Sequence, residues 1–244
     1  MLMRSLLLVR PDHNDGCDAA LAAGADALVI ELRHAPPSSR DEARARARAF
    51  LLRAAALPRR PRLLAEVDTL RTGRADADLE AVMAGAPDAI LLRGAVGAVD
   101  IQHLAAKLAV QEVENGIALG STGILAVVAD TARGVLALGT IPGANPRLLA
   151  ICWDPGALAA EVAADAPRDA AGRLAEPCRM ARGLVVVAAV AAGVAVIDAA
   201  TAGGSAELTR ACSAARRDGF TGKLALDAQQ VPTIARYFAS DRTG

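Results

Sequence analysis

Aromatic side chains are scarce in this 244-residue chain: they make up 2% of it, whereas 53% of the residues are hydrophobic. Proteins that hold single-stranded nucleic acid stack its bases on aromatic side chains that lie beside basic ones. The formal net charge is zero, so no overall positive field attracts nucleic acid or an acidic membrane. We therefore expect no nucleic-acid partner, and a core of alanine, valine, leucine and isoleucine.

The chain also lacks closely spaced cysteines. Its four cysteines are far apart and form no CxxC motif, which argues against a disulfide framework and against a zinc knot. Reduced, buried thiols in a cytoplasmic protein are the simple interpretation. The four residues are Cys17, Cys152, Cys178 and Cys212.

No hydrophobic run is long enough to span a bilayer. The longest, Leu184–Ile197, is divided by Gly193. The chain passes from Arg4 directly into a short apolar run, without the long apolar region and small-residue cleavage site of a secretory signal. No Pro/Ser-rich or charged linker separates two halves. We expect a cytoplasmic protein, no membrane segment and one domain over residues 1–244.

Eight short apolar runs are present, and segments with helical character separate them. Eight strand–helix units in a chain of this length are the pattern of a (β/α)8 TIM barrel. Its interior is filled by branched aliphatic side chains, which suits this composition. The runs are Leu6–Val9, Ala27–Leu32, Arg62–Val67, Ala89–Leu92, Gly123–Ala129, Leu148–Trp153, Val194–Ile197 and Lys223–Leu226.

Polar or charged residues stand at or just past the ends of these runs. In a TIM barrel the C-terminal strand ends form one rim, and that rim carries the active site. We therefore expect the following residues to lie around the barrel mouth: Asp12, Arg33, Glu66, Asp68, Arg93, Asp130, Asp154, Asp198 and Asp227.

Several segments resemble one family. Arg4–Val9 and Gly24–Leu32 resemble the opening of citrate lyase β-subunit-like proteins, which belong to the HpcH/HpaI aldolase superfamily. Gly219–Leu226, followed by Gln230–Pro232, resembles the strand-eight signature of that family. Arg168–Asp198 is similar in length and pattern to the sixth and seventh units. The resemblance covers nearly the whole chain.

The resemblance implies a function. Members of this family cleave or form carbon–carbon bonds, often in acyl-CoA thioesters, and a magnesium ion polarises the reacting oxygens. A divalent cation and a cationic side chain together stabilise the enolate that develops. The resemblance thus implies a small carboxylate or acyl-CoA ligand, Mg2+ and a homo-oligomer.

The working positions of the family are mostly changed in this chain. The metal-binding Glu falls on Asp130, the metal-binding Asp falls on Ala157, and the substrate-binding Arg falls on Glu66. Loss of one electrostatic donor can lower a rate by roughly 100- to 1,000-fold, so we expect the parent activity to be lost or altered. The other changed positions are Gly94 with Arg93 beside it, Arg33 with His34, and Asp227 with Ala228.

Asp130 and Asp154 are the candidate metal ligands. Each has a structural alternative: Asp130 as a helix N-cap, and Asp154 as a turn residue before Pro155-Gly156. Substrate-binding candidates share the same rim, and their alternative is a charge-balanced, metal-free rim in which acidic residues pair with arginines. These candidates are Glu66, Arg93, Arg33 and Asp198.

Three further segments have two interpretations each. Gly203, Gly204 and Ser205 could bind phosphate at a helix N-terminus, or form a flexible loop with Ser205 as the N-cap. Arg44, Arg46 and Arg48 resemble a phosphate-binding run but fit the solvated face of a helix better. His34 is either a general base or a loop histidine.

Two functions from different classes follow. The first is a carbon–carbon lyase that uses Mg2+ through Asp130 and Asp154. The second is a diverged, catalytically inactive paralogue that binds a metabolite or a partner subunit.

Overall fold

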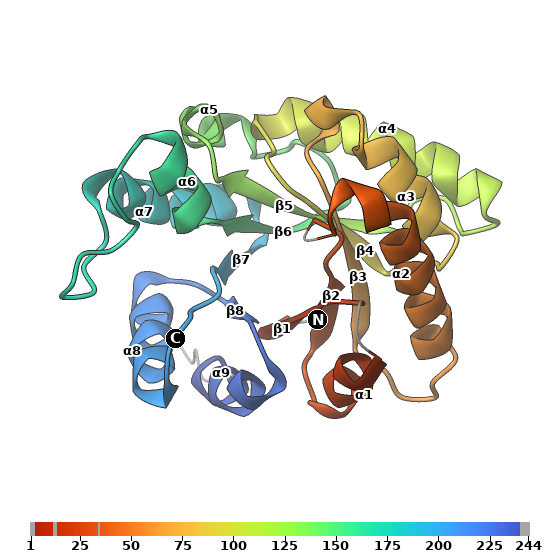
Figure 1. The fold of residues 1–244 in the computed structure, drawn as a ribbon. Helices are drawn as coiled ribbons and strands as arrows, with labels where there is room; N and C mark the ends of the chain where they lie inside the picture. Colours follow the sequence, from red (N-terminus) through yellow and green to blue (C-terminus); the bar gives the residue numbers. More distant parts are fainter. Residues whose placement is uncertain (1–2, 12–13, 34, 240–244) are drawn as a thin grey trace.

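The computed structural model describes residues 3–11, 14–33 and 35–239. Its eight strands are parallel to their neighbours and close into a barrel in chain order, from β1 to β8 and back to β1. Figure 1 shows the helices surrounding this ring. The predicted (β/α)8 TIM barrel is therefore confirmed. The strands are β1 Ser5–Val9, β2 Ala27–Ile30, β3 Arg62–Val67, β4 Ala89–Leu92, β5 Gly123–Ala129, β6 Leu148–Trp153, β7 Ala195–Asp198 and β8 Gly222–Ala225.

The helices follow the strands as the alternating pattern predicts. Short 3-10 turns η1 to η4 precede or follow some of them, at residues 37–39, 70–72, 138–140 and 228–230. The helices are α1 Asn14–Ala22, α2 Arg40–Ala55, α3 Ala75–Met83, α4 Gly97–Glu114, α5 Ala132–Leu136, α6 Pro155–Glu161, α7 Glu176–Ala192, α8 Ser205–Asp218 and α9 Val231–Tyr237. Within the described residues no helix is both long and apolar enough to cross a membrane.

The core has two layers because successive strand residues point to opposite faces. One layer fills the barrel interior and includes Val29, Leu64, Leu91 and Cys152. The other lies between the strands and the helices. A residue at the end of a strand therefore reaches the barrel mouth if its side chain is on the inner face, and the helix layer if it is on the outer face.

The strand ends lie within two residues of the predicted apolar runs. Gly193 ends α7 and Gly219 ends α8, both in the left-handed region at φ 67° and 106°, which glycine adopts readily. The order Ser39-Arg40-Asp41-Glu42 has the pattern of a capping box, and Ser39 is the N-cap of α2, but its side chain makes no cap hydrogen bond. Its hydroxyl donates instead to the Pro36 carbonyl.

Candidate ligand site at the barrel mouth

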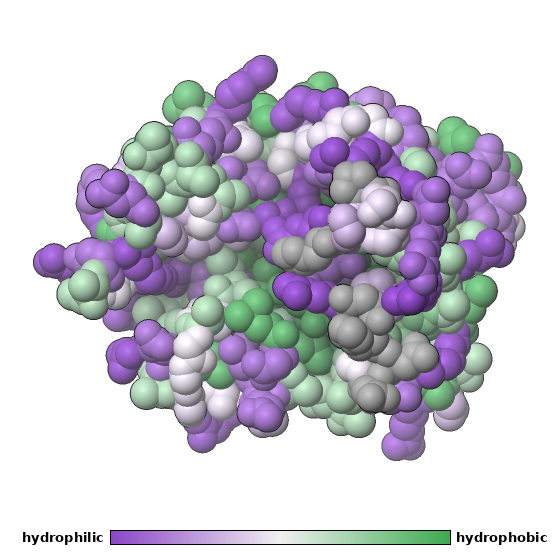
Figure 2. All heavy atoms as spheres, viewed as in Figure 1, coloured by the Kyte–Doolittle hydropathy of each residue, from purple (hydrophilic) through white to green (hydrophobic). Residues whose placement is uncertain are grey.

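Charged side chains from the ends of β2 to β6 converge at the barrel mouth. Glu31, Glu66 and Arg93 each stand two residues after an interior residue of their strand, so they share its inward face. Hydrophilic side chains gather around the centre of the space-filling view, over the ring of strands (Figure 2). We call the following set the mouth cluster: Glu31, Arg33, Glu66, Arg93, Asp130 and Asp154.

Arg93 lies among the carboxylates of the cluster. Its Nη2 donates to Asp154 Oδ2 at 2.5 Å, and its side chain is only 13% exposed. Burial alone would lower the pKa of this guanidinium, but the charges of Glu66, Asp154 and Asp130 outweigh burial and raise it. Arg93 therefore stays charged inside the mouth.

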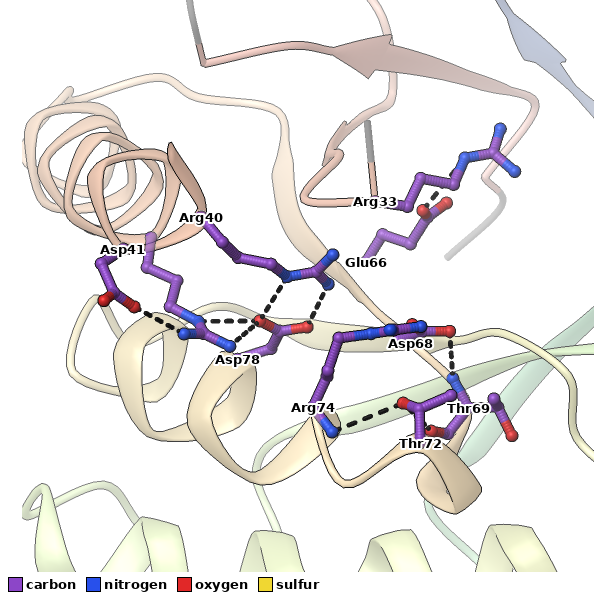
Figure 3. Close-up of polar contacts among 10 residues, drawn as sticks. Arg33, Arg40, Asp41, Glu66, Asp68, Thr69, Thr72, Arg74 and Asp78 are labelled. Atoms are coloured by element: carbon purple, nitrogen blue, oxygen red, sulfur yellow. Dashed lines mark hydrogen bonds and ion pairs between the residues drawn. The ribbon is translucent and has the colours of Figure 1, made fainter. Parts of the chain in front are cut away.

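Arg33 lies at the more open side of the cluster. Its Nε is 3.4 Å from Glu66 Oε1, its Nη1 is 3.8 Å from Asp154 Oδ2, and its Nη2 is 3.3 Å from Glu31 Oε1. Figure 3 shows the Arg33 side chain meeting the Glu66 carboxylate. Because this side chain is 35% exposed and that of Arg93 only 13%, Arg33 is the more accessible of the two guanidinium groups in the mouth cluster.

Glu66 is almost completely buried, at 2% exposure. Burial raises the pKa of its carboxyl group to about 7, although Arg93 and Arg33 act in the opposite direction. Its ion pair with Arg33 lacks hydrogen-bond geometry, and Oε1 has no hydrogen-bond partner among the described residues. Glu66 can therefore gain or lose a proton near neutral pH.

Asp130 keeps one carboxylate oxygen uncommitted. Its Oδ2 accepts a hydrogen bond from the Gly94 N–H at 2.9 Å, whereas its buried Oδ1 has no partner in the described part of the chain. Burial raises the pKa of this carboxyl group. The N-cap alternative for Asp130 is wrong, because Thr131 caps α5 by accepting from the Gly134 N–H.

Asp154 has both oxygens engaged. Oδ1 accepts from the backbone N–H groups of Gly156 and Ala157 at 3.0 and 3.1 Å, which caps α6, while Oδ2 accepts from Arg93. Burial would raise the pKa of this carboxyl group, but the charge and hydrogen bond of Arg93 lower it. Ala157, on which the resemblance places a metal-binding Asp, donates its backbone N–H to Asp154.

These residues do not fit a magnesium ion as they stand. Mg2+ demands near-octahedral oxygen coordination. Both Asp154 oxygens already accept hydrogen bonds, and Arg93 places a positive charge beside this carboxylate. Within the described residues, no group of three His, Cys, Asp or Glu side chains is arranged to hold a metal ion.

Asp198 lies away from the mouth. It follows Val196 on the outer face of β7, in the helix layer, and is 4% exposed. Its carboxylate accepts hydrogen bonds from Arg182 and Lys223 at 2.7 Å and from Trp153 at 2.9 Å. The structure thus places this substrate-binding candidate in a buried ionic cluster that joins β7, β8 and α7.

The glycine segment before α8 faces a carboxylate. Gly204, not Ser205, is the N-cap of α8, so the predicted cap is displaced by one residue. A Cβ atom on Gly203 would lie within 1.8 Å of Glu207 Oε2. The Glu207 side chain therefore occupies space beside the helix start where a bound phosphate is expected, and a negative charge there disfavours an anion.

The arginines of α2 do not form one solvated face. Arg40 and Arg44 both bind the Asp78 carboxylate, at 2.7 and 2.9 Å (Figure 3). Asp78 is fully buried between α2 and α3. Of the three arginines predicted to form a solvated face, Arg46 and Arg48 are exposed, but Arg44 is not, so that prediction is wrong for Arg44.

Other rim candidates have local roles or lie outside the described residues. Asp68 forms an ion pair with Arg74 at 2.6 Å (Figure 3). Asp227 accepts a hydrogen bond from the Gln230 N–H. Asp12 and His34 lie outside the described residues. The sequence interpretation missed Glu31, whose signal was its position two residues after the interior residue Val29.

The family model named HpcH/HpaI aldolase/citrate lyase matches residues 4–228. This chain, a TIM barrel with a charged mouth, belongs to that family. No curated protein is significantly similar to it in sequence.

Solved structures share the fold. The citrate lyase β subunit from Mycobacterium tuberculosis, complexed with oxaloacetate and magnesium, is 22% identical, with a TM-score of 0.81 and 98% of each chain covered. CitE from the same organism, in complex with magnesium, acetoacetate and coenzyme A, is 22% identical, with a TM-score of 0.81; the match covers 99% of this chain and 82% of that one. RipC from Yersinia pestis is 22% identical, with a TM-score of 0.76 and coverage of 98% and 96%.

Proposed function

We propose that this protein binds a small carboxylate, free or as an acyl-CoA thioester, at the barrel mouth, and that it does not catalyse metal-dependent carbon–carbon cleavage. The observation that carries the proposal is the 2.5 Å ion pair between Arg93 and Asp154, which places a guanidinium in the middle of the acidic residues. The ligands named for the solved relatives, oxaloacetate, acetoacetate and coenzyme A, indicate the ligand class.

The chemistry of binding rests on the two arginines of the mouth cluster. A guanidinium presents a planar fork of N–H donors that matches a carboxylate. Arg33 is reachable from solvent, and its contacts with Glu66 and Asp154, at 3.4 and 3.8 Å, are long enough to be exchanged for a ligand. Arg93 pairs with Asp154 at 2.5 Å and provides a second, buried guanidinium beside that carboxylate.

Calorimetric titration of oxaloacetate, in the presence of a chelator, tests the proposal. We expect the unaltered protein to bind it, and Arg33→Ala to weaken binding at least about tenfold, as loss of a charge-assisted hydrogen-bond pair does. Arg46→Ala is the matched control, because Arg46 is an exposed arginine on α2 that pairs with Glu42 and does not belong to the mouth cluster. Equal affinity for Arg33→Ala and Arg46→Ala would contradict the proposal.

Binding should also depend on pH. With Arg10, whose Nε is 3.6 Å from Glu31 Oε2, the mouth holds four carboxyl groups and three guanidinium groups. Fully ionised, it has one more negative than positive charge. Because the pKa of Glu66 is about 7, an incoming anion favours its protonation, so affinity for oxaloacetate should rise as the pH falls through about 7. Glu66→Gln should flatten this dependence between about pH 8 and pH 6.

A second function, the Mg2+-assisted lyase, is favoured by one observation. Asp130 Oδ1 is buried and lacks a hydrogen-bond partner among the described residues, as an unfilled ligand position would. If this function holds, millimolar Mg2+ binds the unaltered protein, Asp130→Ala abolishes that binding, and a short acyl-CoA is cleaved. Absence of all three results leaves the first proposal standing.

A further inference from the structure

The mouth cluster occupies only part of the barrel mouth. Its side chains come from the ends of β2 to β6, and the strands β7, β8 and β1 complete the closed ring between β6 and β2. Figure 2 shows hydrophobic side chains gathered over β8 and β1, next to the hydrophilic ones at the centre of the view. The mouth therefore has a charged part and an apolar part.

Three hydrophobic residues form the apolar part, which we call the apolar sector: Leu8 on β1, Ala200 after β7 and Leu226 after β8. Leu8 and Ala200 are partly buried and pack against the core inside the barrel. Leu226 stands two residues after the interior residue Leu224, so it continues the inner face of β8, and it is 45% exposed. Because β1 and β8 pair in register at Leu6 and Leu224, the next inward residues of the two strands lie side by side at the rim.

The apolar sector borders the mouth cluster directly. On β1, Arg10 stands two residues beyond Leu8, and its Nε lies 3.6 Å from Glu31 Oε2. Neighbouring strands are about 4.8 Å apart, so Leu8 lies about one strand spacing, and Leu226 about two, from the strand that leads to Arg33. A ligand bound to Arg33 therefore needs only a short chain to reach the apolar sector.

Buried polar side chains hold the apolar sector in place from behind. Gln230, which is 7% exposed, accepts a hydrogen bond from the Leu226 N–H at 2.9 Å and donates one to the Thr201 carbonyl at 3.0 Å. Lys223, also buried, donates to the Ala199 carbonyl. Because these bonds fix the backbone at the ends of β7 and β8, the apolar surface is formed before a ligand binds.

We propose that the ligand of this mouth is a monocarboxylate with a short, branched apolar tail. Its carboxylate binds Arg33, as in the proposed function on which this inference rests, and its tail packs on the apolar sector. Covering apolar surface with hydrocarbon removes both from water, whereas a second carboxylate placed on the same surface loses hydration. Leu226, the most exposed residue of the apolar sector, is the specificity-determining residue.

Calorimetric titration with three acids that share one head group tests the inference. Pyruvate is the head group alone, 4-methyl-2-oxopentanoate adds an isopropyl group to it, and oxaloacetate adds a second carboxylate. With a chelator present, we expect 4-methyl-2-oxopentanoate to bind the unaltered protein at least about fivefold more tightly than pyruvate, because burial of part of the added hydrocarbon gives a gain of that order. It should also bind more tightly than oxaloacetate.

Leu226→Ser should reduce the preference for 4-methyl-2-oxopentanoate over pyruvate to less than about twofold and leave the affinity for pyruvate unchanged. The hydrogen bond from the backbone N–H to Gln230 does not need the leucine side chain, so it persists in this variant. Leu136→Ser is the matched control, because Leu136 is an 86% exposed leucine on α5 that belongs neither to the mouth cluster nor to the apolar sector. It should keep the full preference.

The inference and the proposed function fail in different ways. Equal binding of pyruvate and 4-methyl-2-oxopentanoate by the unaltered protein, or tighter binding of oxaloacetate than of 4-methyl-2-oxopentanoate, would overturn the inference and leave the proposed function standing. The same preference in Leu226→Ser and Leu136→Ser would also overturn it. Absence of binding by all three acids would overturn the proposed function, and this inference with it.

Discussion

Glu66 shows how the mouth changes the chemistry of a single residue. Burial raises the pKa of its carboxyl group from 4.5 to about 7, so the folded protein binds this proton more tightly than the unfolded chain does. Ionising the buried carboxyl group costs folding free energy, so stability falls as the pH rises from 4.5 through about 7. Below pH 4.5 the group is protonated in both the folded and the unfolded chain, and this cost is absent.

Glu66→Gln should remove that penalty. We expect the free energy of unfolding to rise by roughly 1–3 kcal/mol at about pH 8, and to change little at about pH 4. Urea denaturation of both proteins at the two pH values measures the difference. A variant that is less stable than the unaltered protein at the higher pH would show that the ionised carboxylate is needed by its arginine neighbours.

The sequence predicted most of the mouth residues but not their pairings. Glu66, Arg93 and Asp154 do lie together, because the ends of parallel strands meet at one rim. Asp198 does not join them, because it is the last residue of β7 and faces outward. Neighbouring residues of a strand face opposite sides, so a shift of one residue decides whether a side chain faces the barrel interior or the helices. The hydrophobic pattern does not fix the end of a strand to one residue.

At the scale of elements, Glu112 connects α4 to the strand starts on the other side of the barrel. It is fully buried, accepts two hydrogen bonds of 2.7 Å from Arg147, and accepts two more from the Gly120 and Thr122 N–H groups. Burial would raise the pKa of its carboxyl group, but the bonds from Arg147 and the backbone lower it to about 2.

Glu112→Gln should therefore destabilise the fold by roughly 3 kcal/mol at neutral pH. Because folding lowers the pKa of Glu112, its ionised carboxylate stabilises the fold fully at pH values above 4.5, and this effect is lost as the pH falls through about 2. The difference in stability between the two proteins should therefore shrink in acid. Thermal unfolding at about pH 7 and about pH 3 checks this. Glu114→Gln, exposed on the same helix, should change stability by less than about 0.5 kcal/mol.

The start of α4 depends on a glycine. Gly97 has φ +70°, and a Cβ atom there would lie 2.3 Å from Thr140 Oγ1. Gly97→Ala should cost roughly 1–3 kcal/mol through strain and crowding. Gly183→Ala in α7, with open space around it, should instead stabilise by up to about 1 kcal/mol. If both changes have the same effect on the melting temperature, backbone strain at Gly97 is not the cause.

Element boundaries were largely predictable, but side-chain partners were not. Buried parallel strands are continuous apolar runs, and glycines mark the ends of α7 and α8. The α2 arginines have the spacing of a solvated face, yet Arg40 and Arg44 turn to a buried Asp78 on α3. That pairing depends on how two helices pack, which helical spacing does not encode.

At the scale of the whole molecule, the barrel was predictable because eight similar units leave few other folds. The predicted homo-oligomer remains a prediction. Leu184, Val187 and Val190 leave apolar surface on α7, with exposed fractions of 42, 66 and 74%. Sedimentation equilibrium should give a mass of at least two chains; a mass equal to one chain across micromolar concentrations would contradict the prediction.

The central claim is that arginines, and not a metal ion, supply the positive charge with which this mouth binds a carboxylate. The most direct measurement is the dissociation constant of oxaloacetate, determined by calorimetry on the unaltered protein with a chelator and again with millimolar Mg2+. We expect the same affinity in both buffers, and loss of oxaloacetate no faster than in the same buffers without the protein. Binding that appears only with Mg2+ would contradict the central claim.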